Sequence, residues 1–391
     1  MTKRITYLDN AATTPVRPEV LEAMLPYLGK DAFGNPSSAH RFGRAARAGI
    51  EEAKRAVAEA VGAEPNQVVF TSGGTEADNL AIIGAALAAK ARGGPFRVAV
   101  PATEHKAGLA AAHAVKHLGG EEVILPVSAS GLVETAALDR AIERGVALVS
   151  VMWVNNEVGT VQPVADLATR CCNGGVLFHS DAVQAFGKIP VSLRDSGCTL
   201  LTISGHKIGA SKGVGALIVR DRKSVEAIIH GGGQQFGIRP GTENVPGIVG
   251  FGVAARLAAL EQPALAPQLR ELRDELERRL LAIVSDAVIN GWQGKRAPHI
   301  SNVSIPGTDS EALLMHLDLA GIACSSGSAC STGAVEPSHV LTAMGVPREL
   351  GVAALRFSFG KDSTLEDVEA LTAALPRIVE KVRSLSAVLH R

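Results

Sequence analysis

Short apolar runs alternate with helical patterns along the first part of the chain. Six of these runs are continuous enough in apolar character to be strands buried on both faces: RVAVPA, EEVILPV, ALVSVMWV, GVLFHSD, TLLTIS and VGALIVRD. Between several of them lie helical patterns such as KAGLAAAHAVKHLGG and ETAALDRAIERG. The alternation predicts βαβ units, a mainly parallel sheet and the α/β fold class.

The pattern changes near residue 263, where QPALAPQ carries two prolines that are predicted to end the helical segment before it. A charged helix, LRELRDELERRLLAIV, is predicted next, followed by strand-like HISNVSI and ALRFSFG with helical SEALLMHLDLAG between them. The length of 391 residues also exceeds the ~250 to 300 at which a single core usually stops growing. We therefore predict a large domain over residues 16–262 and a small domain built from residues 1–15 and 263–391.

Composition and charge narrow the class of protein. With 46% hydrophobic and 20% charged residues, the chain can bury a large core and is not a disordered protein. The 39 Lys and Arg residues equal the 39 Asp and Glu residues, and no block of like charge suggests direct binding to nucleic acid or membrane. The start of the chain lacks the apolar core of a signal peptide. We expect a cytoplasmic protein whose cysteines are reduced.

The residues that follow the predicted strands carry candidate chemistry, because active sites of open parallel sheets lie beyond the carboxyl ends of strands. The turn in VVFTSGG leads into a helix and would suit a phosphate, although such turns are common. Asp181 is either a buried carboxylate with a compensating partner or a helix N-cap. Ser204, His206 and Lys207 follow TLLTIS, where desolvation would give a lysine the lowered pKa of an amine nucleophile. Lys212 is typical of a solvated loop lysine.

Two further strand ends add polar side chains. His105 stands where a strand turns into a helix, either as a cap or surface residue or as part of a site, and Asn156 follows the run VMWV. A phosphate turn, a buried carboxylate, a Ser-x-His-Lys and a strand-end histidine are together the parts needed to bind pyridoxal phosphate. The period of two in ALRFSFG puts Arg356 opposite Leu355 and Phe357, where its guanidinium can point into a cleft or into solvent.

Cys330 lies in SSGSACSTGA, a run of small residues that favour loops and bring little side-chain packing. The spacing of the five cysteines does not suit zinc, so we expect no metal. Cys198 fits a small buried hydrophobe, and we interpret Cys171 and Cys172 in the same way. Cys324 could be an accessory sulfur site, but the burial habits of free cysteine favour packing.

Ten motifs, spread over nearly the whole chain, occur in the order known from one protein family: YLDNAATTP, GNPSSAH, TSGGTEADN, TEHKA, VNNEVG, DAVQ, SGHK, GGGQQFGIRPGTENV, GSACSTG and LRFSFG. The chain resembles the cysteine desulfurases of the nitrogen-fixation and iron–sulfur-assembly type, which are homodimeric pyridoxal phosphate enzymes of fold type I. The resemblance implies a seven-stranded, mainly parallel sheet flanked by helices, and a smaller α/β C-terminal domain carrying the catalytic cysteine loop. It also implies conversion of L-cysteine to L-alanine, with the sulfur held as a persulfide on Cys330 and passed to an acceptor protein in iron–sulfur cluster assembly or another thiolation.

The resemblance also gives a role to each matching position. The catalytic residues would be Cys330 as sulfur acceptor, Lys207 as Schiff-base lysine and Cα base, and His105 as ring neighbour and proton-transfer group. The remaining cofactor ligands would be Asp181 at the pyridine nitrogen, Gln184 and Asn156 at the ring hydroxyl, Gly74, Thr75, Ser204 and His206 at the phosphate, and Thr242 of the other subunit. Arg356, together with Asn156, would bind the substrate carboxylate.

The implied chemistry makes a geometric demand on Cys330, because its thiol must reach the substrate and then an external acceptor. We therefore predict a mobile loop over at least residues 325–334. One departure from the family lies after Lys207, where Ala210 and Ser211 replace the usual Gly-Pro. Two alternatives stay open: another enzyme of the same cofactor class, such as an aminotransferase or selenocysteine lyase, and a non-catalytic sulfur carrier or scaffold.

Overall fold

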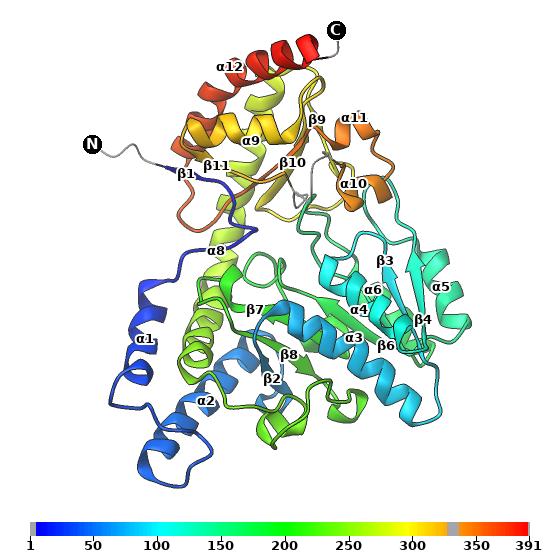
Figure 1. The fold of residues 1–391 in the computed structure, drawn as a ribbon, viewed down its shortest axis with the longest axis vertical. Coiled ribbons are helices and arrows are strands. Elements are labelled where there is room, and N and C mark those ends of the chain that lie inside the picture. Colours follow the sequence, from blue (N-terminus) through cyan, green and yellow to red (C-terminus); the bar gives the residue numbers. More distant parts are fainter. Residues whose placement is uncertain (1–4, 327–335, 390–391) are drawn as a thin grey trace.

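The computed structural model describes residues 5–326 and 336–389. The chain forms two lobes, joined by one long helix that runs from the lower lobe into the upper one (Figure 1). The lower lobe holds the large sheet, and the upper lobe holds the C-terminal strands and helices.

The large sheet has seven strands in the order β2-β8-β7-β6-β5-β3-β4. Its strands are β2 (Val68–Thr71), β3 (Arg97–Pro101), β4 (Glu121–Leu125), β5 (Leu148–Ser150), β6 (Leu177–Asp181), β7 (Leu200–Ser204) and β8 (Gly215–Val219). All pairings are parallel except those of β8, which runs antiparallel to both β2 and β7. The predicted fold class and seven-stranded, mainly parallel sheet are confirmed.

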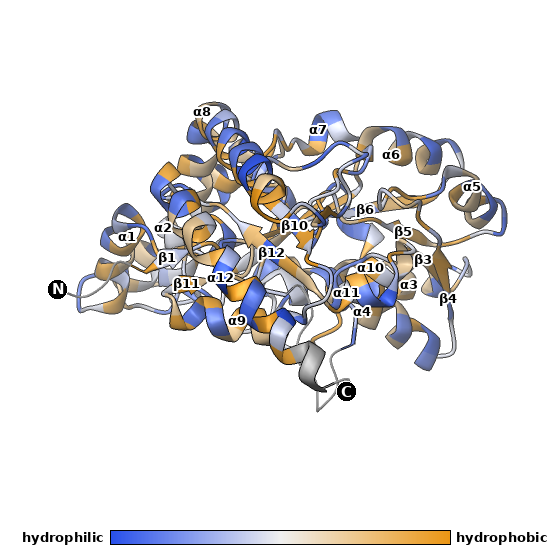
Figure 2. Cartoon of the chain, turned by 90° about the horizontal axis from the view of Figure 1, so that it is seen from above, coloured by the Kyte–Doolittle hydropathy of each residue, from blue (hydrophilic) through white to orange (hydrophobic). Residues whose placement is uncertain are grey.

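Helices cover both faces of this sheet. One face packs against α3 (Gly74–Ala91) and α4 (Lys106–His117), and the other against α2 (Arg41–Ala60), α5 (Thr135–Glu143), α6 (Val164–Asn173) and α8 (Val245–Ile283). Strand residues alternate between the two cores, as Val69 and Phe70 do, because successive side chains point to opposite faces. Figure 2 shows the hydrophobic colouring concentrated on the strands and on the inward faces of the helices. Helix α1 (Pro18–Leu28) packs against α8, and the short α7 (Leu193–Ser196) precedes β7.

The upper lobe has its own core around two small sheets. Strands β9 (Val288–Ile289), β10 (Ile300–Ser304) and β12 (Ala354–Ser358) pair antiparallel, whereas β1 (Thr6–Tyr7) pairs parallel with β11 (Ile322–Ala323). The helices are α9 (Ser310–Leu319), α10 (His339–Ala343), α11 (Arg348–Gly351) and α12 (Leu365–Leu389). The core joins Leu8 of the N-terminal segment to Phe357 and Leu371. The domain limits given above stay a prediction, because the boundary after residue 262 falls inside α8.

Two features differ from the sequence predictions. The prolines at 263 and 267 do not end the helix, since α8 continues through both. Both prolines are exposed, so water can bond the backbone carbonyls that they leave without a donor. Strand β4 is not buried on both faces, because it forms the edge of the sheet and Ile124 is 48% exposed.

Helix α8 is also long and apolar enough to cross a bilayer, by length and composition alone. Its apolar residues, however, lie in the core of the lower lobe, where Ile248, Phe251 and Ala255 contact the sheet and α2. We therefore regard α8 as a core helix that carries the chain from one lobe to the other.

Candidate active site

A cavity of about 400 Å³ lies at the carboxyl ends of the parallel strands. Because β2, β5, β6 and β7 run in one direction, the turns that follow them meet at this edge. The cavity is lined by Ala11, Ala12, Gly74, Thr75, Asp78, His105, Met152, Asn156, Asp181, Val183, Gln184, Ser204, His206, Lys207, Ser325 and Arg356. All ten site residues expected in one chain, Cys330 aside, therefore lie around one space.

Lys207 ends a single 3₁₀ turn (Gly205–Lys207) directly after β7. Its Nζ donates hydrogen bonds to the carbonyl oxygens of Ala11 and Ala12, each at 2.7 Å. Burial, assisted by the positive charge of Arg356, lowers the pKa of Lys207 to about 8, while Asp181 opposes the shift. About a tenth of the amine is therefore neutral at pH 7, far more than for an ordinary lysine, and this neutral form is the one that nucleophilic attack requires.

Asp181 is the last residue of β6 and is buried at the floor of the cavity. Its Oδ1 accepts a hydrogen bond from the backbone N–H of Val183 at 2.8 Å. Burial raises the pKa of Asp181, and the charges of His105 and Lys207 partly offset this. Residues 183–188 form turns rather than a helix, so the alternative of a helix N-cap is wrong. A buried carboxylate of this kind needs a cationic partner.

His105 serves both interpretations that the sequence left open. Its Nδ1 accepts from the N–H of Ala107 at 3.1 Å, which caps α4, while the ring also lines the cavity. Burial lowers the pKa of His105, so the ring is neutral near pH 7.

Gln184 donates from Nε2 to the carbonyl of Ala11 at 2.9 Å and thereby ties the N-terminal segment to the turn after β6.

The first turn of α3 forms one corner of the cavity. Gly73, its N-cap, has φ of 155° and ψ of −177°, a conformation essentially restricted to glycine. Gly74 and Thr75 are the first residues of the helix, where backbone N–H groups have no acceptor within the helix and are suited to bind an anion. Ser204 Oγ is buried there without a hydrogen-bond partner among the described residues.

His206 completes this corner. Its Nδ1 lies 3.2 Å from Thr13 Oγ1, and burial with the charge of Lys207 lowers the pKa of His206 to about 4. Lys212 lines an adjoining hollow together with Thr75, Ser204 and His206. Lys212 is exposed in a loop, as expected, and this loop also places it beside the phosphate turn, which its position in the sequence did not indicate.

Arg356 enters the cavity from β12, on the face opposite Leu355 and Phe357, as the period of two predicted. One terminal nitrogen donates to the carbonyl of Asn156 at 3.0 Å and the other to Asp9 Oδ1 at 2.8 Å. Its Nε is buried without an acceptor in the described part of the chain. Asp9 belongs to the motif YLDNAATTP, but nothing in the sequence alone pairs it with Arg356.

Two expected features are not seen at the cavity among the described residues, and one departure from the family follows Lys207. Thr242 is exposed and does not line the cavity of its own chain. Cys330 and most of the predicted mobile loop lie outside the described residues, whereas Ser325 and Arg356 exchange backbone hydrogen bonds at the cavity wall. After Lys207, Gly209 has φ of 85° and Ala210 N–H donates to Gly205, so the turn forms with Ala210 in place of the family's glycine.

The other cysteines divide into two groups. Cys171 and Cys198 are buried, as expected, but Cys172 is exposed, because it faces outward at the end of α6. The prediction for Cys172 is therefore wrong. Cys324 packs against the core of the upper lobe, and burial raises its pKa to about 12. A thiol in that state is a poor nucleophile, which agrees with the packed interpretation.

Comparisons with known proteins identify the family. Residues 6–371 match the family described as aminotransferase class-V. A "Cysteine desulfurase IscS" of Dictyoglomus turgidum is 45% identical over 384 residues, covering 98% of this chain and 97% of that protein. One from Methanosarcina thermophila is 42% identical over 97% of this chain and 93% of its own. The solved structure of a NifS-like protein from Rickettsia africae superposes with a TM-score of 0.85 at 32% identity, covering 96% of this chain and 100% of that chain.

The chain therefore belongs to the class-V aminotransferases, which use pyridoxal phosphate, and within them to the cysteine desulfurases. The cavity fits this cofactor in size, since pockets for such ligands span roughly 300–1,000 Å³. Its polar groups fit as well. The orphan hydroxyl of Ser204 and the N–H groups of α3 suit a phosphate, and the buried Asp181 suits a protonated pyridine nitrogen.

Proposed function

We propose that this protein removes the sulfur atom of L-cysteine, releases L-alanine and holds the sulfur as a persulfide on Cys330. The observation that carries the proposal is the convergence of Lys207, Asp181 and Arg356 on one cavity whose wall includes Ser325. Cys330 follows Ser325 by five residues, which limits their Cα separation to roughly 18 Å. The thiol is therefore tethered to the cavity wall.

Bound pyridoxal phosphate supplies an electrophilic carbonyl and an electron-withdrawing ring. The chain's own residues hold and move protons around it. Asp181 remains ionised only beside a positive charge and therefore favours a proton on the pyridine nitrogen. Lys207, whose pKa is lowered to about 8, can take the substrate's Cα proton and return a proton to carbon. His105, whose pKa is lowered by burial, lines the same cavity and would be available to exchange a proton there.

Arg356 orients the substrate. Its guanidinium is already held by Asp9 and the carbonyl of Asn156, which leaves the buried Nε as a donor without an acceptor in the described part of the chain. A carboxylate would satisfy this donor and gain a charge-assisted hydrogen bond. The α-carboxylate of L-cysteine would then lie at Arg356, in the cavity whose wall includes Ser325.

The sulfur step balances without an external oxidant or reductant. The Cys330 thiolate attacks the substrate sulfur, a new S–S bond forms, and the C–S bond of the substrate breaks. The electron pair of that bond stays on carbon, which takes up a proton to become the methyl group of L-alanine. One thiol and L-cysteine thus become one persulfide and L-alanine.

We also propose that two copies of the chain form the working enzyme. Thr242 is exposed on a segment linked to the phosphate turn, since Arg239 of that segment forms an ion pair with Glu76 of α3 at 2.7 Å. Leu21, Leu25 and Leu28 present an apolar stripe on the outer face of α1, each more than half exposed. A second copy would cover such a stripe and bring its Thr242 to this chain's cofactor phosphate.

We propose a cytoplasmic enzyme that passes its sulfur to an acceptor protein, with iron–sulfur cluster assembly as the use implied by the sequence resemblance. The free state of the four described cysteines supports a reducing compartment. Subcellular fractionation with a tagged chain would test the location.

The central test incubates the holoenzyme with L-cysteine and measures L-alanine together with the mass of the peptide containing Cys330. We expect alanine and a mass increase of one sulfur atom on Cys330. Cys330→Ala should retain the visible spectrum of the cofactor but lose the persulfide and most alanine formation. Cys324→Ala is the matched control and should keep both products, because its thiol is packed.

The two alternatives give other outcomes. Formation of a keto acid from the amino acid, with no persulfide, would indicate an aminotransferase and overturn the proposal. A purified protein without a borohydride-reducible chromophore would instead indicate a sulfur carrier or scaffold.

A further inference from the structure

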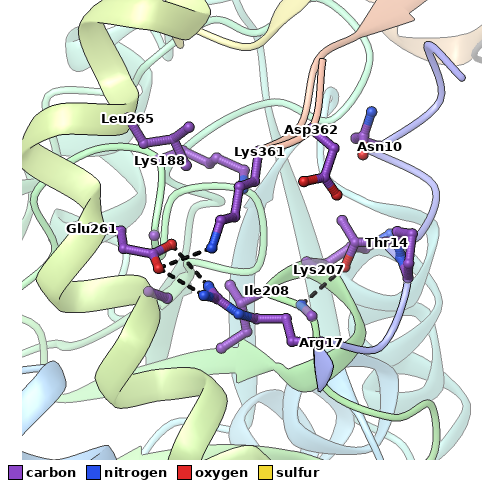
Figure 3. Close-up of a pocket in the computed structure, with 14 residues that line it drawn as sticks. Asn10, Thr14, Arg17, Lys188, Lys207, Ile208, Glu261, Leu265, Lys361 and Asp362 are labelled. Atoms are coloured by element: carbon purple, nitrogen blue, oxygen red, sulfur yellow. Dashed lines mark hydrogen bonds and ion pairs between the residues drawn. The ribbon is translucent and has the colours of Figure 1, made fainter. Parts of the chain in front are cut away.

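Lys207 also lines a second, smaller cavity of about 70 Å³ (Figure 3). Lys207 lines this cavity and the cofactor cavity, so the lysine forms part of the wall between them. The second cavity lies where the N-terminal segment, α8 and the turn after β12 meet. Its polar lining is Asn10, Thr14, Arg17, Lys188, Lys207, Glu261, Lys361 and Asp362.

Three of the six charged side chains in this lining, Arg17, Glu261 and Lys361, are paired with one another. Arg17 makes a bidentate contact with Glu261 at 2.6 and 2.8 Å, and Lys361 reaches the same carboxylate at 3.0 Å, as the dashed lines in Figure 3 show. Glu261 therefore has two cationic partners and no spare charge. Asp362 is exposed at the mouth of the cavity and forms no ion pair with a described residue.

Among the basic side chains of this lining, only Lys188 makes no hydrogen bond or ion pair through its terminal nitrogen within the described residues. The residue is 9% exposed. Burial, together with the charge of Arg17, lowers the pKa of Lys188 to about 8, and Glu261 offsets this incompletely. The ammonium is therefore mostly charged at neutral pH, and a buried charge without a partner is costly unless something compensates it.

We propose that this cavity binds one small monovalent anion, of the size and charge of a halide, against Lys188. The volume is large enough for about two water molecules or one such ion. The charge argument favours an anion over water alone, because the lining carries four basic side chains, Arg17, Lys188, Lys207 and Lys361, against the two carboxylates of Glu261 and Asp362.

The rest of the lining predicts which anions bind best. Pro15, Ile208 and Leu265 give the cavity apolar walls, so an ion that enters loses much of its hydration. Weakly hydrated anions lose the least on entry, so iodide, thiocyanate and bromide should bind more tightly than chloride, and chloride more tightly than fluoride. A bound anion would also connect the segment with Arg17, helix α8 and the turn with Lys361, and so stabilise one lobe against the other.

The direct test is crystallography of the holoenzyme with sodium bromide, using the anomalous signal of bromine. We expect a bromide peak within contact distance of Lys188 Nζ. A cavity that holds only water at saturating bromide, or a Lys188 that pairs with Asp362 instead, would overturn the proposal.

A solution test does not depend on crystals. We expect the Tm of the holoenzyme to rise by roughly 1–3 °C and then saturate as bromide replaces gluconate at constant ionic strength. Lys188→Met should abolish this increment. Lys54→Met is the matched control, because Lys54 is an equally buried lysine whose ammonium lies over Phe236, away from this cavity.

For the proposal to stand, Lys188→Met must lose the rise in Tm with bromide, whereas Lys54→Met must keep it. Equal bromide responses in Lys188→Met and the wild type would mean that the effect is a general salt effect. The anion site depends only on described residues around Lys188. It can therefore be absent while the persulfide chemistry is correct, or be present while that chemistry is wrong.

Discussion

Arg356 is held so firmly that its contribution to substrate binding can be separated from its contribution to chemistry. Asp9 and the Asn156 carbonyl fix the guanidinium before any substrate arrives, at 2.8 and 3.0 Å. A group that binds ground state and transition state alike changes KM and leaves kcat nearly unchanged. Substitution of Arg356 or of Asp9 should therefore raise KM and leave kcat nearly unchanged, with a larger effect on KM for Arg356.

We predict that Arg356→Gln raises the KM for L-cysteine roughly 10- to 100-fold, the loss expected for a charge-assisted hydrogen bond. Asp9→Asn should raise KM less, because the amide oxygen still accepts from the guanidinium. Steady-state alanine formation measures both. A variant with unchanged KM and a low kcat would contradict a carboxylate-binding role, and an unchanged visible spectrum would show that the cofactor is still held.

The lowered pKa of Lys207 predicts how the rate of cofactor attachment depends on pH. Only the neutral amine attacks the cofactor's carbonyl, and the pKa of Lys207 is lowered to about 8. The rate of cofactor attachment to the cofactor-free protein should therefore rise about tenfold per pH unit below pH 8 and level off above it. Stopped-flow absorbance after mixing with pyridoxal phosphate measures this profile.

The same experiment on Arg356→Gln provides the control. The charge of Arg356 helps to lower the pKa of Lys207, so its removal should move the plateau to higher pH. A wild-type plateau above pH 10 would mean that the buried lysine keeps its ordinary pKa, and the assignment of a preformed nucleophile would be wrong.

At the scale of elements, helix α10 carries the chain away from the segment that contains Cys330. Ser338 is its N-cap: the hydroxyl accepts from the N–H of Val340 at 3.0 Å and donates to the buried carboxylate of Glu157. Glu157 follows Asn156 in the turn after β5, so this contact joins the upper lobe to the cofactor cavity. Burial raises the pKa of Glu157, while the Ser338 hydroxyl lowers it.

We predict that Ser338→Ala destabilises the protein by about 2–3 kcal/mol, because it removes a helix cap and leaves a buried carboxylate without its donor. The loss should be larger at pH 8 than at pH 5, because the variant further raises the pKa of Glu157 and ionisation then opposes folding. Thermal unfolding at the two pH values measures it. Ser338→Thr retains a hydroxyl and should lose little; equal losses in both variants would contradict the role of the hydroxyl.

The strands and helix α8 also show which features can be predicted from the sequence and which cannot. The strands were predictable because runs such as TLLTIS and GVLFHSD carry their burial in their own composition, and the site residues follow those runs directly. The continuity of α8 was not predictable, because the tolerance of Pro263 and Pro267 depends on solvent at those positions. Asp9 was missed for a related reason, since its partner Arg356 lies 347 residues away in the chain.

At the scale of the whole molecule, one chain does not supply every expected ligand of the cofactor. Thr242 is exposed, outside the cavity, on a segment that Arg239 ties to the phosphate turn through Glu76. If Thr242 of each copy reaches the active site of its partner, each active site contains residues of both chains. Defects in different chains can then complement one another.

We predict complementation between Lys207→Ala and Thr242→Tyr. The first variant lacks the nucleophilic amine, and the second blocks the partner's phosphate site with a bulky side chain. A heterodimer purified through two different tags should contain one intact site, with Lys207 from one chain and Thr242 from the other. Its alanine formation should reach about half the wild-type rate per dimer, because closed two-fold symmetry gives two equivalent sites.

The two homodimers are the controls, and both should be nearly inactive. If Thr242 serves only its own chain, the heterodimer can be no more active than its share of the Thr242→Tyr chain, and sharing of the site is excluded. Sedimentation at assay concentrations completes the test, since a wild-type enzyme that is active as a monomer would contradict the shared site even if the variants behave as expected.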